Sequence, residues 1–263
     1  MTDGLLKKWL PRELKRELDA IAAGRFEPIG RGKSKRARLV QEWLCLRGQG
    51  ISVDGDFGPA TATAVANFRR AARLPGGETV DAAAFEALVR PMTDALQPIA
   101  PAGGLSAMTA AYARQHLTQH PLEVGGPNSG PWVRLYMDGN EGEPWAWCAG
   151  FVTFLLRQAA DSLGERMPIR GSFSCDTLAA QAKEKGLFVA ERDRTASALL
   201  PGAIFLNRRT STDWVHTGIA MGFRDEVFET IEGNTNDNGS REGVEVLARI
   251  RGYAKKDFIR LPS

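Results

Sequence analysis

Two kinds of periodicity follow one another along this chain, and their order restricts the fold more than any other feature. Up to about residue 185, apolar residues recur at helical spacing, as in the segment that starts at Cys148. Short runs rich in Val, Ile, Phe and Thr come afterwards, at 187–190, 203–207, 214–222, 227–232 and 244–251. Helices first and strands later predict an α+β fold with an antiparallel sheet.

The N-terminal part of the helical region predicts a small three-helix bundle. Helical spacing over 38–46 ends at a glycine-rich segment, and the turn Val53-Asp-Gly-Asp-Phe-Gly-Pro leads into a second helix. Asp81 is a candidate N-cap for a third helix that runs to about Val89. A bundle of this length is close to the lower size limit for independent folding.

This stretch, residues 40–89, resembles the three-helix peptidoglycan-binding domain family. The matching positions are Val40-Gln41, Leu44, Val53-Asp54-Gly55, Phe57-Gly58-Pro59, Thr61, Ala64-Val65, Phe68, Val80-Asp81 and Leu88. The resemblance implies that the bundle binds peptidoglycan, with Asp54 and Phe57 as candidate substrate-binding residues. Arg69 is a departure, because the family often has Gln there. The alternative is a bundle that only packs against its neighbour.

The composition divides the chain into four parts. We expect a basic helical arm at 1–33, the bundle at 34–91, a linker rich in Pro, Ala and Gly at 92–106, and a second domain at 107–263. The first 38 residues hold eleven Lys and Arg against five Asp and Glu, which is a net +6. We interpret them as a solvated helix face plus a flexible arm, since no aromatic residues interleave with the charges as a nucleic-acid surface would require.

Cys148 is the candidate nucleophile of the second domain. It starts the helical segment WCAGFV, where unpaired amide groups and the positive end of the helix dipole favour a thiolate. A thiolate is what an amide-cleaving cysteine enzyme requires. The alternative is a buried apolar cysteine, which is the commoner role of a free thiol. Cys45 is expected in a helix core, and Cys175 starts another helix without an assigned histidine.

Two later strands supply partners for this thiol. His216 lies in an alternating strand pattern and can accept the thiol proton. Glu232 and Asn234 follow 16 and 18 residues later, the distance of one hairpin, and are expected to share a strand face. One of them would orient the imidazole. The alternatives are a satisfied core histidine and an exposed polar strand end.

Residues 107–261 resemble the CHAP family of cysteine amidases and endopeptidases. The resemblance is carried by Trp147-Cys148-Ala149-Gly150-Phe151-Val152, Pro201-Gly202, Val215-His216-Thr217-Gly218-Ile219-Ala220 and Glu232-Gly233-Asn234. It implies a papain-like domain in which Cys148 is the nucleophile, His216 the base, Glu232 the orienting acid and Asn234 an accessory polar residue. We also assign Trp147 and Trp214 as candidate substrate-binding residues. Ala203 departs from the family, which commonly has Asp there, and the backbone amide of Cys148 is the one oxyanion donor that we assign.

We expect no cofactor and no metal. His116 and His120 have zinc-compatible spacing but lack an acidic third ligand, which predicts a surface pair. The acidic loop from Asp138 to Glu143 lacks a full calcium pattern and is expected to be solvated.

These features predict a peptidoglycan hydrolase, either an N-acetylmuramoyl-L-alanine amidase or a stem-peptide endopeptidase; the alternative from another class is a non-catalytic wall-binding protein. With neither a signal peptide nor a membrane-spanning segment in the sequence, we expect synthesis in the cytoplasm and no membrane insertion. Action in the periplasm or outer wall would follow lysis or export, as for a phage lysin or an antibacterial toxin. A toxin would add secretion machinery and an immunity protein as partners.

Overall fold

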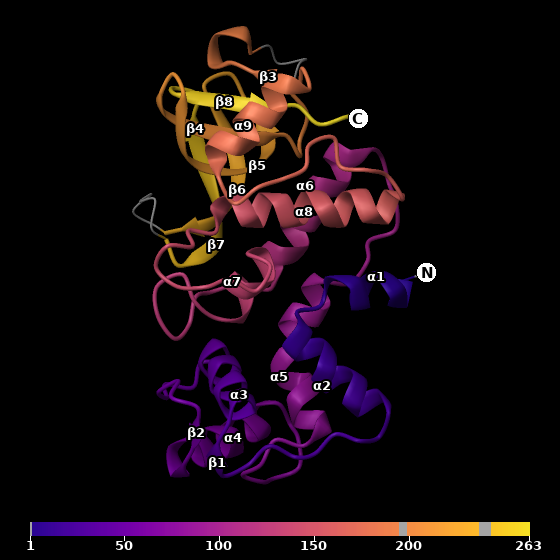
Figure 1. Ribbon diagram of the computed structural model, residues 1–263, viewed down its shortest axis with the longest axis vertical. Helices are drawn as coiled ribbons and strands as arrows, with labels where there is room; N and C mark the ends of the chain where they lie inside the picture. The colour runs from indigo at the N-terminus through magenta and orange to yellow at the C-terminus, as the bar shows by residue number, and fades with distance from the viewer. Residues whose placement is uncertain (1, 195–198, 237–242) are drawn as a thin grey trace.

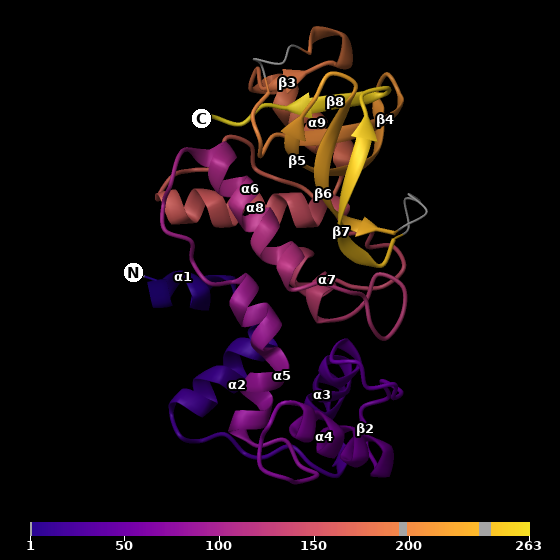
Figure 2. The same cartoon turned by 180° about the vertical axis from the view of Figure 1, so that it is seen from behind.

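The computed structural model describes residues 2–194, 199–236 and 243–263. Two units lie along the long axis (Figure 1). We call residues 2–95 the N-terminal unit and residues 105–263 the C-terminal unit. The sheet lies at one end of the molecule and the N-terminal unit at the other, which the reverse view also shows (Figure 2).

The N-terminal unit is helical, as predicted. Its helices are α1 (Thr2–Trp9), α2 (Arg12–Ala22), α3 (Lys35–Leu46), α4 (Pro59–Ala71) and α5 (Ala82–Ala95), and the two-residue strands β1 (Gly32–Lys33) and β2 (Asp56–Phe57) pair with each other. Ser34 and Asp81 cap α3 and α5 by accepting hydrogen bonds of 2.9 Å from the amides of Ala37 and Ala84. The N-cap predicted at Asp81 is therefore confirmed.

A single buried side chain holds the glycine-rich turn in place. Gln41 of α3 is 1% exposed, and its carbonyl oxygen accepts from the amides of Asp54 and Gly55. Its amide group donates to the Asp54 carboxylate, to a backbone oxygen and to Thr61. The turn is thus fixed from inside the bundle.

Two predicted boundaries differ from the structure. Helix α5 continues through Pro91 to Ala95, because Met92 and Ala95 extend its buried face, so the linker is 96–104 instead of 92–106. The N-terminal arm is not a flexible extension. Trp9 is 5% exposed, and its indole N–H donates to Asp161 of the C-terminal unit at 2.8 Å. An apolar face under the basic residues explains this docking.

The C-terminal unit places helices against an antiparallel sheet. The helices are α6 (Leu105–Thr118), α7 (Pro131–Tyr136), α8 (Cys148–Leu163), α9 (Cys175–Glu184) and the short η1 (Glu191–Asp193). The strands are β3 (Phe188–Val189), β4 (Ile204–Thr210), β5 (Asp213–Phe223), β6 (Val227–Thr235), β7 (Glu245–Gly252) and β8 (Lys256–Ile259), in the order β3-β8-β4-β5-β6-β7. This architecture confirms the predicted α+β class.

Helices α6 and α8 pack against each other and against β5 and β6. This packing sets the first turn of α8 beside two central strands. Gly233 of β6 permits the approach, because a Cβ atom there would lie 2.7 Å from the Trp147 ring and 2.8 Å from Phe151. No helix among the described residues has both the length and the apolar character needed to cross a bilayer.

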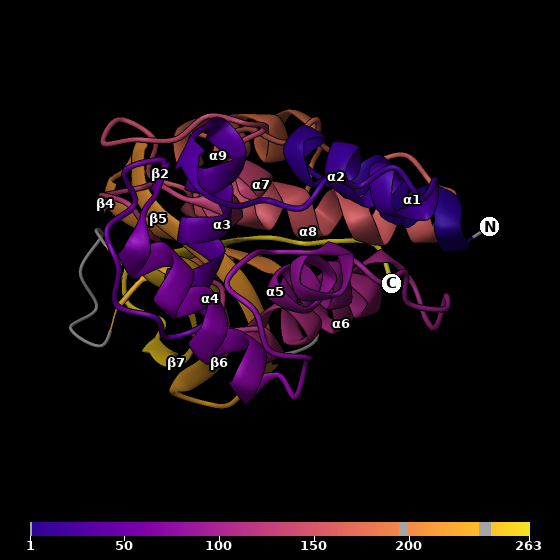
Figure 3. The same cartoon turned by 90° about the horizontal axis from the view of Figure 1, so that it is seen from below.

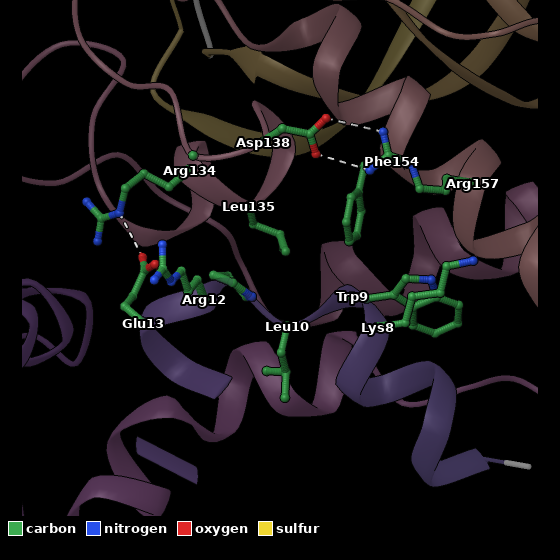
Figure 4. Close-up of a pocket in the computed structure, with 12 residues that line it drawn as sticks. Lys8, Trp9, Leu10, Arg12, Glu13, Arg134, Leu135, Asp138, Phe154 and Arg157 are labelled. Atoms are coloured by element: carbon green, nitrogen blue, oxygen red, sulfur yellow. Dashed lines mark hydrogen bonds and ion pairs between the residues drawn. The ribbon is translucent and has the colours of Figure 1, made fainter. Parts of the chain in front are cut away.

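Arg134 of α7 joins the two units. Its guanidinium contacts Glu42 of α3 at 2.7 Å, Glu13 of α2 at 2.9 Å and Glu141 at 2.7 Å. Beside it, a pocket of about 330 Å³ lies between the first two helices and α7 and α8 (Figure 4). Helix α1 lies against α8 in the same region (Figure 3). Ion pairs and side-chain packing therefore connect the units in addition to the linker.

Candidate functional site

Cys148 is the first residue of α8 and is 5% exposed. This confirms the placement of the thiol at a helix start. The backbone amide of Ala149, one of the amides that a helix start leaves unpaired, contributes to lowering the pKa of this thiol.

His216 of β5 lies beside this sulfur. The ring is 5% exposed, and its interaction with Cys148 affects the pKa of both groups. No hydrogen-bond partner among the described residues satisfies Nδ1, which is buried. Catalytic hydrogen bonds are often long or poorly aligned before a ligand is bound.

Glu232 of β6 holds the other side of the ring. Its Oε2 atom lies 2.8 Å from Nε2 of His216, and the carboxylate is 0% exposed. Arg251 of β7 donates to both carboxylate oxygens, at 2.7 and 2.5 Å, and Thr230 donates to Oε1 at 2.6 Å. Gly218 leaves room for this side chain, since a Cβ there would lie 2.8 Å from its Cγ.

The charges of the three groups support one another. The hydrogen bond from Cys175, and then His216, hold the pKa of Cys148 well below its ordinary value despite burial. Burial alone would lower the pKa of His216, but Cys148 and Glu232 outweigh it and raise the pKa to about 9. Burial likewise opposes ionisation of Glu232, but Arg251 and His216 bring its pKa to about 2. A thiolate–imidazolium pair next to a carboxylate is the result.

Asn234 lies farther along β6 and is 1% exposed. The pairing with β7 shifts register between Glu232 and Thr235, and Asn234 has a φ of 54°. The prediction that Glu232 and Asn234 share a strand face assumed regular alternation, and this bulge interrupts it.

Cys175 completes the site, and the sequence reasoning missed it. It begins α9, is 7% exposed, and its sulfur lies 4.0 Å from that of Cys148. The start of a second helix was a usable signal, but nothing in the sequence placed α9 beside α8.

The two predicted substrate-binding tryptophans lie in different surroundings. Trp147 is 0% exposed, stacks on Tyr136 and donates to Glu123 at 2.7 Å, so it belongs to the core instead of a binding surface. Trp214 lines a cavity of about 660 Å³, with the amino group of Lys183 4.5 Å from its ring. Its indole N–H donates to Asp257 at 2.9 Å.

The candidates in the N-terminal unit are also structural in part. Phe57 is 1% exposed and packs in the core, whereas Asp54 is exposed on the turn. Arg69, the departure from the family pattern, donates to the backbone oxygens of Pro75 and Thr79 and to Asp81. It therefore fixes the segment before α5.

The possible metal ligands have other partners. His116 was expected on the surface but is 0% exposed; it contacts Tyr136 and Gln158 at 2.8 Å, and burial lowers its pKa to about 4. In the acidic loop, Asp138 pairs with Arg157 and Glu141 with Arg134. Within the described residues, no group of three or more His, Cys, Asp or Glu side chains is placed to hold a metal.

Fold and site together define an α+β protein with a buried cysteine–histidine–glutamate cluster at a helix start. Residues 35–88 match the family described as "Predicted Peptidoglycan domain". This part of the chain is therefore similar to a peptidoglycan-binding domain, which supports a peptidoglycan-related protein. Among curated proteins and among solved structures, none shows a significant match to this chain.

Proposed function

We propose that this protein hydrolyses an amide bond in the peptide part of peptidoglycan, with Cys148 as the nucleophile. The observation that carries the proposal is the 2.8 Å contact between His216 and Glu232, next to a thiol whose pKa His216 lowers. Its residue types and order are similar to those of the CHAP family. The peptidoglycan domain in the same chain indicates peptidoglycan as the polymer that this site would act on.

The proposed reaction has two stages. The Cys148 thiolate attacks the amide carbonyl, the His216 imidazolium protonates the departing amine, and an acyl-enzyme remains. The now neutral imidazole then takes a proton from water, whose oxygen attacks the thioester, and the thiolate leaves while the imidazolium re-forms. Glu232 stays ionised throughout and positions the ring. The backbone amide of Cys148 is the candidate donor to the oxyanion.

Digestion of purified sacculi tests this function. Turbidity should fall with the wild-type protein and stay constant with Cys148→Ala, because the nucleophile is absent. Cys45→Ala is the matched control, since that thiol donates to the backbone oxygen of Ile51, away from the cluster. A Cys148→Ala variant that lyses sacculi at the wild-type rate would disprove the proposal. Lysis by neither protein, with both sedimenting on sacculi, would indicate a non-catalytic wall-binding protein.

The bond we assign joins the lactyl group of the glycan to L-alanine, as in an N-acetylmuramoyl-L-alanine amidase. Mass spectrometry of the released fragments distinguishes the alternatives. An amidase separates glycan from stem peptide and exposes a new amino group on L-alanine. An endopeptidase leaves that link intact and opens the stem or the cross-link.

Delivery by a phage lysis system or by a secretion machine would bring such an enzyme to the wall. Expression with and without transport to the periplasm separates these cases from a cytoplasmic role, since lysis should require transport. If the protein is an exported toxin, its producer should also encode an immunity protein that binds it.

A further inference from the structure

Two helix starts meet at the candidate site, and each begins with a cysteine. Cys148 opens α8 and Cys175 opens α9, and both helices pack against β5. The two sulfur atoms are 4.0 Å apart, both thiols are free, and the side chains are 5% and 7% exposed. The proposed hydrolysis uses only one of them. The second buried thiol therefore calls for its own explanation.

The pair is divided into one thiolate and one thiol. Either sulfur could donate in the contact between them, and the arrangement with Cys175 as donor lowers the pKa of Cys148 and raises the pKa of Cys175. Cys148 is therefore the sulfur that reacts with an oxidant. Once that sulfur is neutral, the largest contribution that raises the pKa of Cys175 is lost. The second thiol then becomes easier to ionise.

We propose that Cys175 is a resolving cysteine, which forms a reversible disulfide with Cys148 after a peroxide has oxidised the Cys148 sulfur. The Cys148 thiolate attacks one oxygen of hydrogen peroxide, the O–O bond breaks, and hydroxide leaves a sulfenic acid behind. The Cys175 sulfur attacks this sulfenic sulfur, the S–O bond breaks, and the leaving hydroxide takes up the Cys175 proton to give water. The hydroxide from the first step takes up one further proton, so that one thiolate, one thiol, one proton and one hydrogen peroxide give one disulfide and two molecules of water.

The geometry suits this step. A disulfide bond is about 2.05 Å long, so the sulfurs must approach from the 4.0 Å that now separates them. Both side chains belong to the first residues of their helices, where fewer backbone hydrogen bonds restrain the chain. The disulfide would occupy the Cys148 sulfur and shield it from irreversible oxidation to a sulfinic acid. A dithiol reductant would return two electrons and two protons and restore the pair.

Peptide mass spectrometry on the full-length protein tests the proposal. After treatment with hydrogen peroxide and alkylation of free thiols, wild type should yield one cross-linked species that joins the peptides of Cys148 and Cys175. Dithiothreitol should reverse it. Cys45→Ser should behave as wild type, whereas Cys175→Ser and Cys175→Ala should gain oxygen on Cys148 and resist reversal. Wild type that gains two oxygens on Cys148 as fast as Cys175→Ser, without the cross-link, would overturn the proposal.

The consequence for hydrolysis rests on the proposed function, and the two can fail separately. Oxidised wild type should lose more than about nine-tenths of its lytic activity and regain it with dithiothreitol, because the nucleophile is masked. A cross-link in a protein that never lyses sacculi would leave the disulfide standing and refute the hydrolase. Lysis of sacculi by a protein that forms no cross-link would support the hydrolase and refute the disulfide. The mass measurement needs no substrate, so the activity of the variants does not limit it, and circular dichroism shows that each variant is folded before oxidation.

Discussion

The Nε2 atom of His216 and the Oε2 atom of Glu232 lie 2.8 Å apart, and Arg251 holds both oxygens of that carboxylate. Bidentate contact fixes the plane of the carboxylate and, through it, the ring. The other ring nitrogen, Nδ1, stays available within the buried site. In the proposed reaction Arg251 is therefore a positioning residue, separated from the Cys148 sulfur by Glu232 and His216.

Glu232→Gln should lower the rate of hydrolysis and narrow its pH range. A neutral amide removes one of the contributions that raise the pKa of His216 to about 9. The imidazolium is lost as pH rises through that value, so the alkaline limb should lie near pH 9 in wild type and at lower pH in the variant. The rate should fall by about 10²- to 10⁴-fold. Rates of sacculus lysis from pH 5 to about 10 measure both effects.

Asn234→Ala should lower the rate of hydrolysis less than Glu232→Gln does. The bulge in β6 interrupts the alternation that would place Asn234 on the same strand face as Glu232, which holds the imidazole. The pH profile of Asn234→Ala should keep the wild-type alkaline limb. The assignment is reversed if Asn234→Ala is the more damaging change while Glu232→Gln stays near wild type.

Gly233→Ala should destabilise the C-terminal unit. The new methyl group would lie 2.7 Å from Trp147 and 2.8 Å from Phe151, and overpacking of this kind costs about 1–3 kcal/mol. Gly252→Ala is the matched control at the end of the neighbouring strand, where a Cβ meets nothing within 4 Å. Urea unfolding should separate the two variants. Equal free energies of unfolding would show that the strand relaxes away from α8.

Arg134→Ala should cost far more stability than Arg157→Ala, although both arginines line the pocket of Figure 4. Removing Arg134 leaves the 1% exposed Glu42 carboxylate with Arg38 as its remaining ion-pair partner among the described residues, at a cost of about 3 kcal/mol. The Arg157–Asp138 pair is more exposed and should contribute about 0–1 kcal/mol. Thermal unfolding compares the stability of the two variants. Similar losses of stability would mean that the contacts of Arg134 contribute little to the folded state.

A chelator should leave lysis unchanged. Asp138 and Glu141 of the acidic loop pair with arginines, and the nucleophile needs no metal in the proposed reaction. Activity in excess EDTA, with and without added calcium, measures this. Loss that calcium restores would make the loop a metal site.

Local patterns predicted the elements that local physics determines. Capping by Asp81 and the helix start at Cys148 depend on neighbouring residues, and the hairpin spacing was enough to bring Glu232 to His216. Strand β8 was missed because it is only four residues long and begins with two charges.

Features that depend on distant packing could not be predicted. Cys175 reaches Cys148 because α9 and α8 both pack against β5, and no local periodicity specifies that packing. His116 is polar, yet two buried hydrogen bonds satisfy it, so residue type alone misplaced it. Trp147 follows the same rule, since its indole N–H donates to the half-buried Glu123 carboxylate.

The ion pairs of Arg134 also limit which bonds of a glycan strand the proposed nucleophile can reach. A wall-binding domain on a loose tether lets its partner sample every bond within reach, and the length of the tether sets the local concentration. Here the N-terminal helices contact α7 and α8 directly. Glu13 and Glu42 pair with Arg134 of α7, and Trp9 donates to Asp161 of α8. Anchor and thiol would therefore keep a constant offset, so that only bonds at one spacing from the anchored repeat would come into register with Cys148.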